Sequence, residues 1–287
     1  MAPQQSPTLR RRRLGHELRE LREQAGLTLD QAAARLEDFS AAKISRIETA
    51  KVGARPRDVE DLLTLYGVQD AQHRKNLITL TREARQRGWW EQFTDAMAPS
   101  QELYIGLEAE AILIRMFSSQ AISGIFQTAA YAREVLKMIW TSEPPEQIER
   151  RVKLRMARQE ILERQDAPQI RCILEEDVLQ RPVGGYEVLH EQLRRLAELA
   201  ESPNVSIRVL PHSIGAHPAI DGPFWMVDFA QPDPSVVHVE YRTGGIYIEQ
   251  EEEVKIYSDI FMRLEDAAMS SEQSLTLIKT LSGESAH

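Results

Sequence analysis

The first 85 residues are divided by glycine, proline and capping residues into short segments that each have the apolar spacing of a helix. Leu14, Leu18 and Leu21 recur at intervals of three and four, which places them on one stripe of a helix. Gly26 follows, at a position where helices commonly end. The predicted helices cover 14–25, 29–36, 41–49, 56–66 and 71–87. Five short helices constrain this part of the chain to a small helical bundle.

The second and third predicted helices are joined by a brief break at 37–39. Thr28 and Ser40 each precede one of them and can cap it through a hydroxyl. Ile44 and Ile47 point to one side of the third helix. The opposite side carries Ala42, Ser45, Arg46 and Thr49. Small and basic residues on an outward face let a helix approach base edges, so this pair has the pattern of a helix-turn-helix whose second member enters a major groove.

The charge distribution separates the start of the chain from the rest. The net charge of the whole chain is −9. Residues 1–85 hold 16 Lys and Arg against 12 Asp and Glu, a net of +4, and this leaves 19 against 32, a net of −13, for residues 86–287. A basic head on an acidic body allows the head to face phosphates. Residues 1–13, with arginine at 10–13, are expected to be a basic N-terminal arm, either a solvated tail or an arm along DNA.

Three consecutive motifs between Leu18 and Val68 carry a family resemblance: LREQAGLTLDQAAARL, SAAKISRIETAK and RPRDVEDLLTLYGV. Together they resemble the XRE (Cro/repressor-type) helix-turn-helix family. The resemblance implies a structural ion pair between Arg22 and Glu48. The chain departs from the family in a longer turn without glycine, in Ala50 where a glycine is usual, and in Leu29 where a phosphate-contacting glutamine is common.

The expected DNA contacts combine the outward face of the third helix with positions that the resemblance supplies. Ser40, Lys43, Ser45 and Arg46 are the strongest candidates on the third helix, and the resemblance adds the phosphate contacts. The full set is Thr28, Ser40, Ala41, Ala42, Lys43, Ser45, Arg46, Lys51 and Arg55.

Residues 88–287 are expected to form an α+β domain with a mainly antiparallel sheet, after a helix-turn-helix domain at 14–87. The predicted helices cover 106–117, 128–140, 145–165, 186–201, 251–268 and 271–281. The predicted strands cover 169–175, 205–210, 223–230, 236–242 and 245–250. In two of these runs apolar side chains alternate with polar ones, which indicates half-buried strands: Val205, Ile207 and Val209, and Val237, Val239 and Tyr241. A turn at 242–245 predicts a hairpin.

Several motifs of this second domain are similar to the uncharacterised C-terminal domain attached to XRE-type regulators of actinobacteria. They are YIGLE at 104–108, GIFQTAAYAREVL at 124–136, RVKLRMARQEIL at 151–162, IRVLP at 207–211, GAHPAIDGPF at 215–224 and VVHVEYR at 236–242. The resemblance implies a regulator of development or secondary metabolism, often encoded beside a small partner protein, and implies no particular ligand.

Candidate ligand or partner sites in this domain are the Arg155 and Arg158 pair on a helix and the His238 and Glu240 pair on one strand face. Each has an ordinary alternative, a solvated charged face. His212 and His217 lack a metal-binding pattern, and the single cysteine, Cys172, excludes a disulfide within the chain. With no phosphate loop, no GxSxG and no convincing nucleophile, neither catalysis nor a cofactor or metal is expected.

These observations predict a cytoplasmic, sequence-specific transcriptional regulator that binds double-stranded DNA as a homodimer, with a C-terminal domain that senses a small ligand or a partner protein. No apolar run is long enough for a membrane helix. Two other classes stay open. One is an antitoxin-like or partner-controlled interaction protein, and the other is a ligand-modifying enzyme fused to a DNA-binding head.

Overall fold

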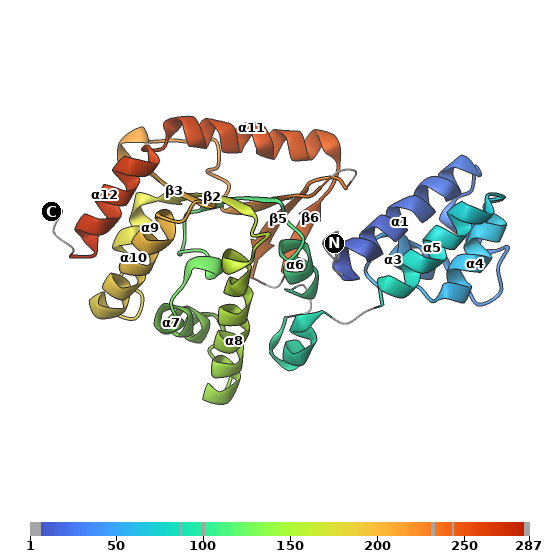
Figure 1. Cartoon of the computed structure of the whole chain (residues 1–287), viewed down its shortest axis with the longest axis horizontal. Helices are drawn as coiled ribbons and strands as arrows, with labels where there is room; N and C mark the ends of the chain where they lie inside the picture. The colour runs from blue at the N-terminus through green and yellow to red at the C-terminus, as the bar shows by residue number, and fades with distance from the viewer. Residues whose placement is uncertain (1–6, 86–87, 99–100, 231–232, 243, 284–287) are drawn as a thin grey trace. The chain divides into compact units, whose positions relative to one another are not determined.

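The computed structural model of the chain describes residues 7–85, 88–98, 101–230, 233–242 and 244–283 (Figure 1). They form two compact units. The first comprises residues up to Glu91 together with Leu103–Glu110, and the second comprises Gln92–Glu102 together with residues from Ala111 onward. The expected domains were 14–87 and 88–287, and in the structure the second unit begins at Gln92. Within the first unit, Gly106 lies close to Thr8, so residues far apart in the sequence come together there.

The first unit is a bundle of short helices. Their bounds are α1 Pro7–Gln24, α2 Leu29–Ala33, α3 Ala41–Glu48, α4 Pro56–Leu65 and α5 Ala71–Glu83. A 3-10 segment, η1 (Trp89–Ala96), and α6 (Gln101–Glu108) follow in the chain. Leu18, Ile44, Leu62 and Leu63 are fully buried in the bundle core. The helices predicted at 29–36, 41–49, 56–66 and 71–87 are confirmed, with ends shifted by a few residues; residues 86–87 of the last one lie outside the described part of the chain.

The second unit is built on one six-stranded sheet with the order β3-β2-β1-β4-β5-β6. The strands are β1 Leu113–Ser118, β2 Gln169–Glu175, β3 Val205–Leu210, β4 Phe224–Asp228, β5 Val236–Tyr241 and β6 Gly244–Ile248. The pairs β1–β2 and β2–β3 are parallel, and the other three pairs are antiparallel. The α+β class is confirmed, and the sheet is mixed, with antiparallel pairs in the majority as predicted.

Helices cover both faces of this sheet (Figure 1). Helix α11 (Glu251–Ala267) packs on one face, against Phe117, Met226 and Val237. The opposite side carries η2 Gly124–Phe126, α7 Ala129–Ile139, α8 Pro145–Arg158, η3 Gln159–Glu163, α9 Glu176–Gln180 and α10 Tyr186–Ala200. A short 3-10 turn, η4 (His212–Ile214), follows β3.

The β3 edge of the sheet is closed by α12 (Ser271–Leu281) and the turn before it. The Met269 backbone N–H donates to the Val209 carbonyl at 2.8 Å, and the Val209 N–H donates to the Ser274 hydroxyl at 2.9 Å. Ser270 caps α12. The strand edge thus has hydrogen-bond partners and is not left open for another chain.

One predicted helix is wrong. The pattern over 106–117 predicted a single helix, whereas α6 ends at Glu108 and Leu113–Ser118 is β1, a central strand. Strand β1 is flanked by β2 and β4 and covered on both faces, so its residues show no alternation of apolar and polar side chains. A short apolar run of this kind cannot be assigned to strand or helix from its periodicity.

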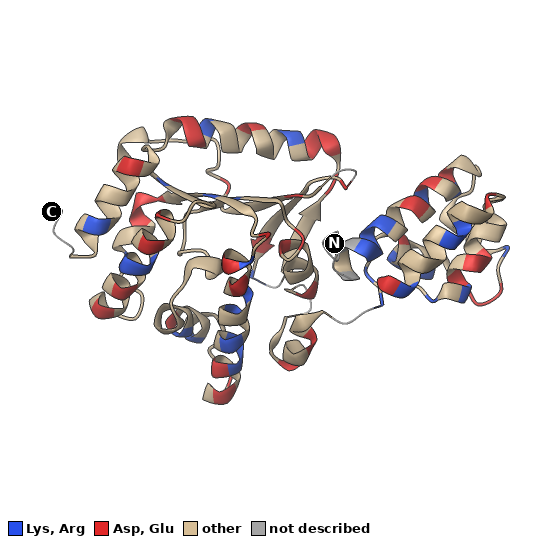
Figure 2. Cartoon of the chain, viewed as in Figure 1, with Lys and Arg blue, Asp and Glu red and all other residues tan. Residues whose placement is uncertain are grey.

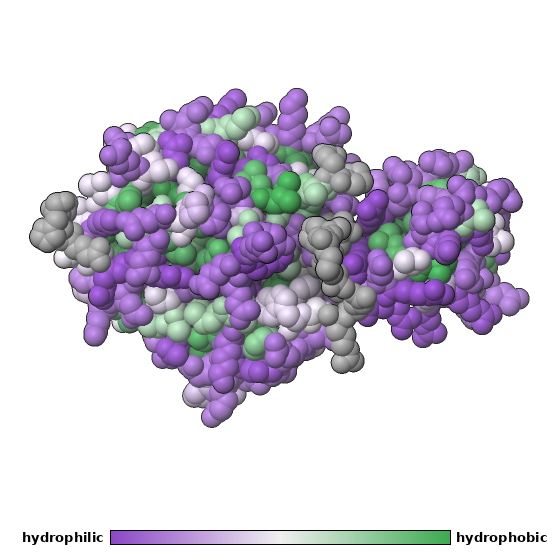
Figure 3. Space-filling model, viewed as in Figure 1, coloured by the Kyte–Doolittle hydropathy of each residue, from purple (hydrophilic) through white to green (hydrophobic). Residues whose placement is uncertain are grey.

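Most of the visible surface is hydrophilic, and the apolar patches on it are small and separated (Figure 3). In the part of the chain that the structure describes, every helix is too short or too polar to span a bilayer.

Candidate nucleic-acid interface

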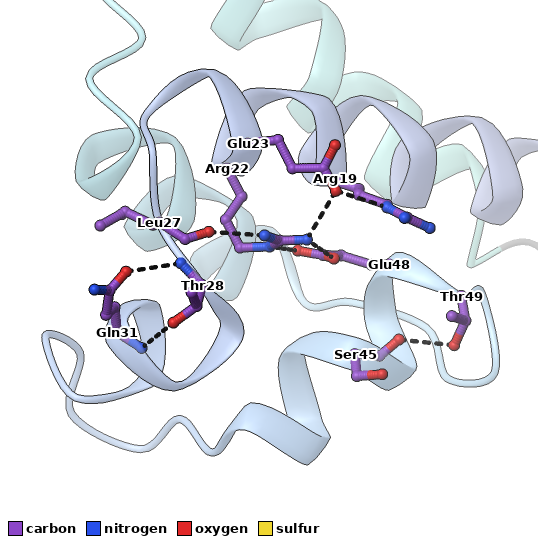
Figure 4. A network of polar contacts seen from close by, with 9 residues as sticks. All are labelled: Arg19, Arg22, Glu23, Leu27, Thr28, Gln31, Ser45, Glu48 and Thr49. Carbon is purple, nitrogen blue, oxygen red and sulfur yellow. Dashed lines mark hydrogen bonds and ion pairs between the residues drawn. The ribbon is translucent and has the colours of Figure 1, made fainter.

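Capped turns fix where α2 and α3 begin. The Thr28 hydroxyl accepts a hydrogen bond from the Gln31 backbone N–H at 3.2 Å, and the Gln31 side chain accepts one from the Thr28 N–H at 2.9 Å (Figure 4). The Ser40 hydroxyl accepts a hydrogen bond from the Lys43 N–H at 3.1 Å. These bonds satisfy N–H groups that have no partner within the first helical turn. Both predicted caps are confirmed.

Helix α1 approaches the end of α3 closely at Gly15. A Cβ atom at this position would lie 2.4 Å from the backbone oxygen of Glu48, so a side chain would force the two helices apart. Gly15 therefore sets the spacing that lets a side chain from α1 reach Glu48.

Arg22 of α1 and Glu48 of α3 form a bidentate ion pair inside the bundle. Arg22 Nε donates to Glu48 Oε1 at 2.8 Å and Nη2 donates to Oε2 at 2.9 Å, and less than a tenth of either side chain is exposed (Figure 4). Nη1 also donates to the Leu27 carbonyl at 2.7 Å, which ties down the turn before α2. The hydrogen bond to Glu48 raises the pKa of Arg22. Because the pair lies inside the bundle, it positions α3.

The turns on either side of α3 each contain a non-glycine residue with positive φ. The angle is +65° at Asp38 and +56° at Ala50. This left-handed region costs an L-residue about 1–2 kcal/mol. Ala50 stands where the XRE resemblance places a glycine, and the backbone keeps the conformation that suits glycine. The departure in sequence is therefore absorbed as local strain and leaves the turn in place.

The outward face of α3 carries few long side chains. Ala42 and Arg46 are exposed, and Ser45 is half-buried. Arg46 Nε donates to the Ala42 carbonyl at 3.3 Å, which lays the guanidinium along the helix toward Ala42. The Thr49 hydroxyl donates to the Ser45 carbonyl at 2.7 Å, so its hydrogen atom is used within the helix. Together with Ala41, these residues form what we call the reading face of α3.

Lys43 lies apart from the reading face. Its Nζ is 3.0 Å from Asp58 Oδ1 and donates to the Asp38 carbonyl at 3.3 Å. The amine also lies 4.0 Å from the centroid of the Phe39 ring. These three contacts join α3 to α4 and to the preceding turn. The sequence analysis did not identify Asp58. Its position in the first turn of α4, where an acidic residue is favourable, could have indicated it.

The three expected phosphate contacts stand around α2 and α3. Thr28 is exposed at the start of α2, Lys51 is exposed just after α3, and Arg55 is exposed at the start of α4. The Arg55 backbone N–H donates to Asp58 Oδ2 at 3.4 Å. The Arg55 side chain takes no part in this cap.

The basic N-terminal arm is the expectation that the structure overturns for residues 7–13, which belong to α1; residues 1–6 lie outside the described part of the chain. Arg10 and Arg12 are buried. Arg10 Nε lies 3.6 Å from Glu83 Oε2, and Arg11 Nε donates to the Ala84 carbonyl at 3.1 Å. Through these contacts Arg10 and Arg11 join α1 to the end of α5.

The candidate site residues of the second unit are not gathered in one place. Arg155 Nη1 donates to the buried Gln127 Oε1 at 2.7 Å, and the Gln159 side chain donates to the Gln127 carbonyl at 2.7 Å. Arg158 is half-buried at the end of α8. Arg155 therefore takes part in a network that holds the segment around η2.

His238 and Glu240 share a face of β5, but they lie in different surroundings. His238 is buried between Trp225 and Tyr247, whose ring centroids lie 6.1 and 4.6 Å from its own. Burial lowers the pKa of His238 to about 4. Glu240, two residues further along the strand, is exposed. The pair is thus half core and half surface, and it does not form a single polar cluster.

The two loop histidines each contact a carboxylate. His217 Nε2 lies 3.0 Å from Glu175 Oε1, and His212 Nε2 lies 3.2 Å from Asp177 Oδ1. Within the described ranges, no three His, Cys, Asp or Glu side chains come together in a way that could hold a metal ion.

Two arginines outside the expected set fix residues 92–96, at the start of the second unit. Arg151 donates to both Glu143 oxygens, at 2.7 and 2.6 Å, and to the Ala96 carbonyl at 2.5 Å, and it stacks 3.9 Å from the Trp140 ring. Arg150 Nε donates to Asp95 at 3.2 Å and lies over Phe93. Helix α8, which carries a run of basic side chains, thereby anchors this segment (Figure 2). In the sequence, the adjacent arginines 150 and 151 follow Trp140 and Glu143, and this proximity could have indicated an ion pair with ring stacking.

Comparison with known proteins divides the chain in the same order. Residues 13–75 match the family described as a helix-turn-helix domain. Residues 101–280 match the family described as a domain of unknown function, DUF5753. No curated protein and no solved structure matches the chain.

Proposed function

The chain belongs to the DUF5753 family and begins with a helix-turn-helix domain, and on this basis we propose that it is a sequence-specific DNA-binding transcriptional regulator of the XRE type. In this proposal α3 enters the major groove of double-stranded DNA. Thr28, Lys51 and Arg55 contact phosphates. The Ser40 hydroxyl, whose oxygen caps α3, donates its hydrogen to a further phosphate.

The observation that carries the proposal is the division of α3 into two faces. Ile44 and Ile47 are buried in the bundle, and Glu48 is held by Arg22. The reading face opposite them carries small side chains and one exposed guanidinium. A helix whose buried face is fixed by the bundle and whose exposed face carries small side chains can enter a major groove about 12 Å wide.

We propose that the regulator acts as a homodimer. A single helix-turn-helix reads only a few base pairs, and two copies related by a twofold axis read two half-sites.

The second unit is proposed to control DNA affinity in response to a small ligand or a small partner protein, by binding rather than by catalysis. Such control requires that the signal bind two conformations of the protein with different affinities. The contacts of Arg150 and Arg151 with residues 92–96 support this role, because they connect α8 to the segment that follows the DNA-binding unit in the chain. A shift of α8 would move that segment.

Fluorescence anisotropy with a pool of labelled duplexes tests DNA binding directly. Arg46→Ala is expected to weaken binding to a selected sequence by about 5- to 150-fold, the range for one base-reading arginine. Arg82→Ala is the matched control, because Arg82 is an exposed arginine on α5, outside α2 and α3. Equal affinities for all three proteins would refute the proposed reading helix.

Native mass spectrometry of the full-length protein, purified gently from cells that make it, tests control and assembly. A dimer with a discrete small added mass supports ligand control, and a dimer with a bound small protein supports partner control. A bare monomer would contradict the proposed assembly.

A further inference from the structure

The reading face of α3 contains few groups that could recognise a base. Within the described residues, the Arg46 guanidinium makes one hydrogen bond, to Ala42, and its two terminal nitrogens have no protein partner. Ala41 and Ala42 present methyl groups only. Lys43, the other cation of the helix, is held by Asp58 and Phe39.

The groups that would read adenine or cytosine are missing from this face. A side-chain amide recognises adenine through N6 and N7, and a carboxylate accepts from cytosine N4. None of the residues from Ala41 to Thr49 is Asn or Gln, and the one carboxylate, Glu48, is buried against Arg22. In α2, the Gln31 amide oxygen accepts from the Thr28 N–H.

The remaining groups of the reading face, a guanidinium and alanine methyl groups, fit features of two bases. A guanidinium pairs with O6 and N7 of guanine through two parallel hydrogen bonds, and an alanine methyl group packs against the C5-methyl of thymine. The bond from Arg46 Nε to the Ala42 carbonyl places the guanidinium and the Ala42 methyl group side by side on one helical turn. A helix with this surface would meet the two bases at neighbouring positions.

Resting on the proposed function, we propose that each half-site of the operator is read through one guanine by Arg46 and through adjacent thymine methyl groups by Ala42 and Ala41. Ser45 supplies one adaptable hydroxyl, and Lys43 reads no base. Recognition by Arg46 and the two alanines is then confined to guanine and thymine edges, on either strand.

The test starts from sequences selected from random duplex DNA by the full-length protein. In synthetic duplexes of the selected sequence, each thymine is replaced in turn by uracil, which removes only the 5-methyl group. Each guanine is replaced by 7-deazaguanine, which removes the N7 acceptor. Each duplex is titrated against wild-type protein and against the Ala42→Gly and Arg46→Ala variants.

We expect uracil at one or two half-site positions to weaken wild-type binding about fourfold, the value of one buried methyl group, and to leave Ala42→Gly unaffected there. We expect 7-deazaguanine at a neighbouring position to weaken wild-type binding about tenfold and to leave Arg46→Ala unaffected. Because each variant serves as its own reference, a loss of helix stability does not change the comparison.

Two results separate this inference from the proposed function. A selected sequence whose affinity is insensitive to every uracil and deazaguanine substitution would overturn the inference while leaving DNA binding in place. A failure to select any sequence would overturn the proposed function and the inference with it.

Discussion

At the scale of single residues, Ala50 holds a backbone conformation that glycine adopts without cost. Its φ of +56° lies in the left-handed region. Ala50→Gly should therefore raise the free energy of unfolding of the first unit by about 1 kcal/mol. Ala34 has a φ of −66°, so Ala34→Gly is the control and should lower stability. Thermal unfolding of both variants checks this, and an Ala50→Gly variant no more stable than the wild type would show that the turn is unstrained.

His238 makes the stability of the second unit depend on pH. Its pKa of about 4 in the folded chain is below the ordinary value of 6.5, so between these values the unfolded chain binds the proton and the folded chain does not. The full contribution of neutral His238 to the free energy of unfolding is therefore present above about pH 6.5. As the pH is lowered from there toward 4, the free energy of unfolding falls by about 1.4 kcal/mol per pH unit.

The measurement is urea unfolding at pH 7 and pH 5, followed by tryptophan fluorescence. His238→Gln should lose less stability between the two pH values than the wild type, by about 2 kcal/mol. His190, which is exposed on α10, supplies the control His190→Gln. Equal pH dependence in the wild type and His238→Gln would mean that His238 titrates normally in the folded chain.

At the scale of elements, the Arg22–Glu48 pair decides how α3 is held. Removing one partner by Arg22→Met leaves a buried carboxylate and should cost about 3–5 kcal/mol. Replacing both, by Arg22→Met with Glu48→Leu, should restore much of that loss because no buried charge remains. Urea unfolding of the single and double variants forms the cycle. A double variant as unstable as the sum of both single variants would show that the two side chains act independently.

The anchoring of residues 92–96 to α8 gives a second prediction at this scale. Arg151→Ala removes the hydrogen bond to the Ala96 carbonyl and the stacking on Trp140, so amide hydrogen exchange should become faster in 92–96. Arg164→Ala, which removes an exposed pair with Asp166, is the control. Exchange in 92–96 that is unchanged by Arg151→Ala would remove the support for coupling through α8.

Elements were predictable from the sequence where local chemistry decides them. Thr28 and Ser40 fix helix starts by capping, and β2 and β3 were predicted at their observed bounds because apolar and polar residues alternate over much of both runs. Strand β1 was missed because its apolar residues, Leu113, Ile114, Met116 and Phe117, do not alternate with polar ones. Lys43, expected among the DNA contacts, lies against Asp58, and Arg10, expected in a solvated tail or an arm along DNA, lies against Glu83; neither partner is evident from the local sequence. The sequence shows which side chains are charged, whereas the direction in which a long side chain points depends on the fold.

At the scale of the whole molecule, an acidic protein with a basic DNA-binding head must gain affinity from a few phosphate contacts. Each phosphate neutralised adds about 0.9 to the slope of log affinity against log salt. Lys51→Ala should lower the magnitude of this slope by about 1.8 if two copies bind one operator, and by about 0.9 if one copy binds. The expected value is the larger one, because the proposed regulator is a dimer. Titrations at several salt concentrations with wild type, Lys51→Ala and Arg82→Ala measure it. The slope should be unchanged for Arg82→Ala, and a slope unchanged for Lys51→Ala would place Lys51 away from the phosphates.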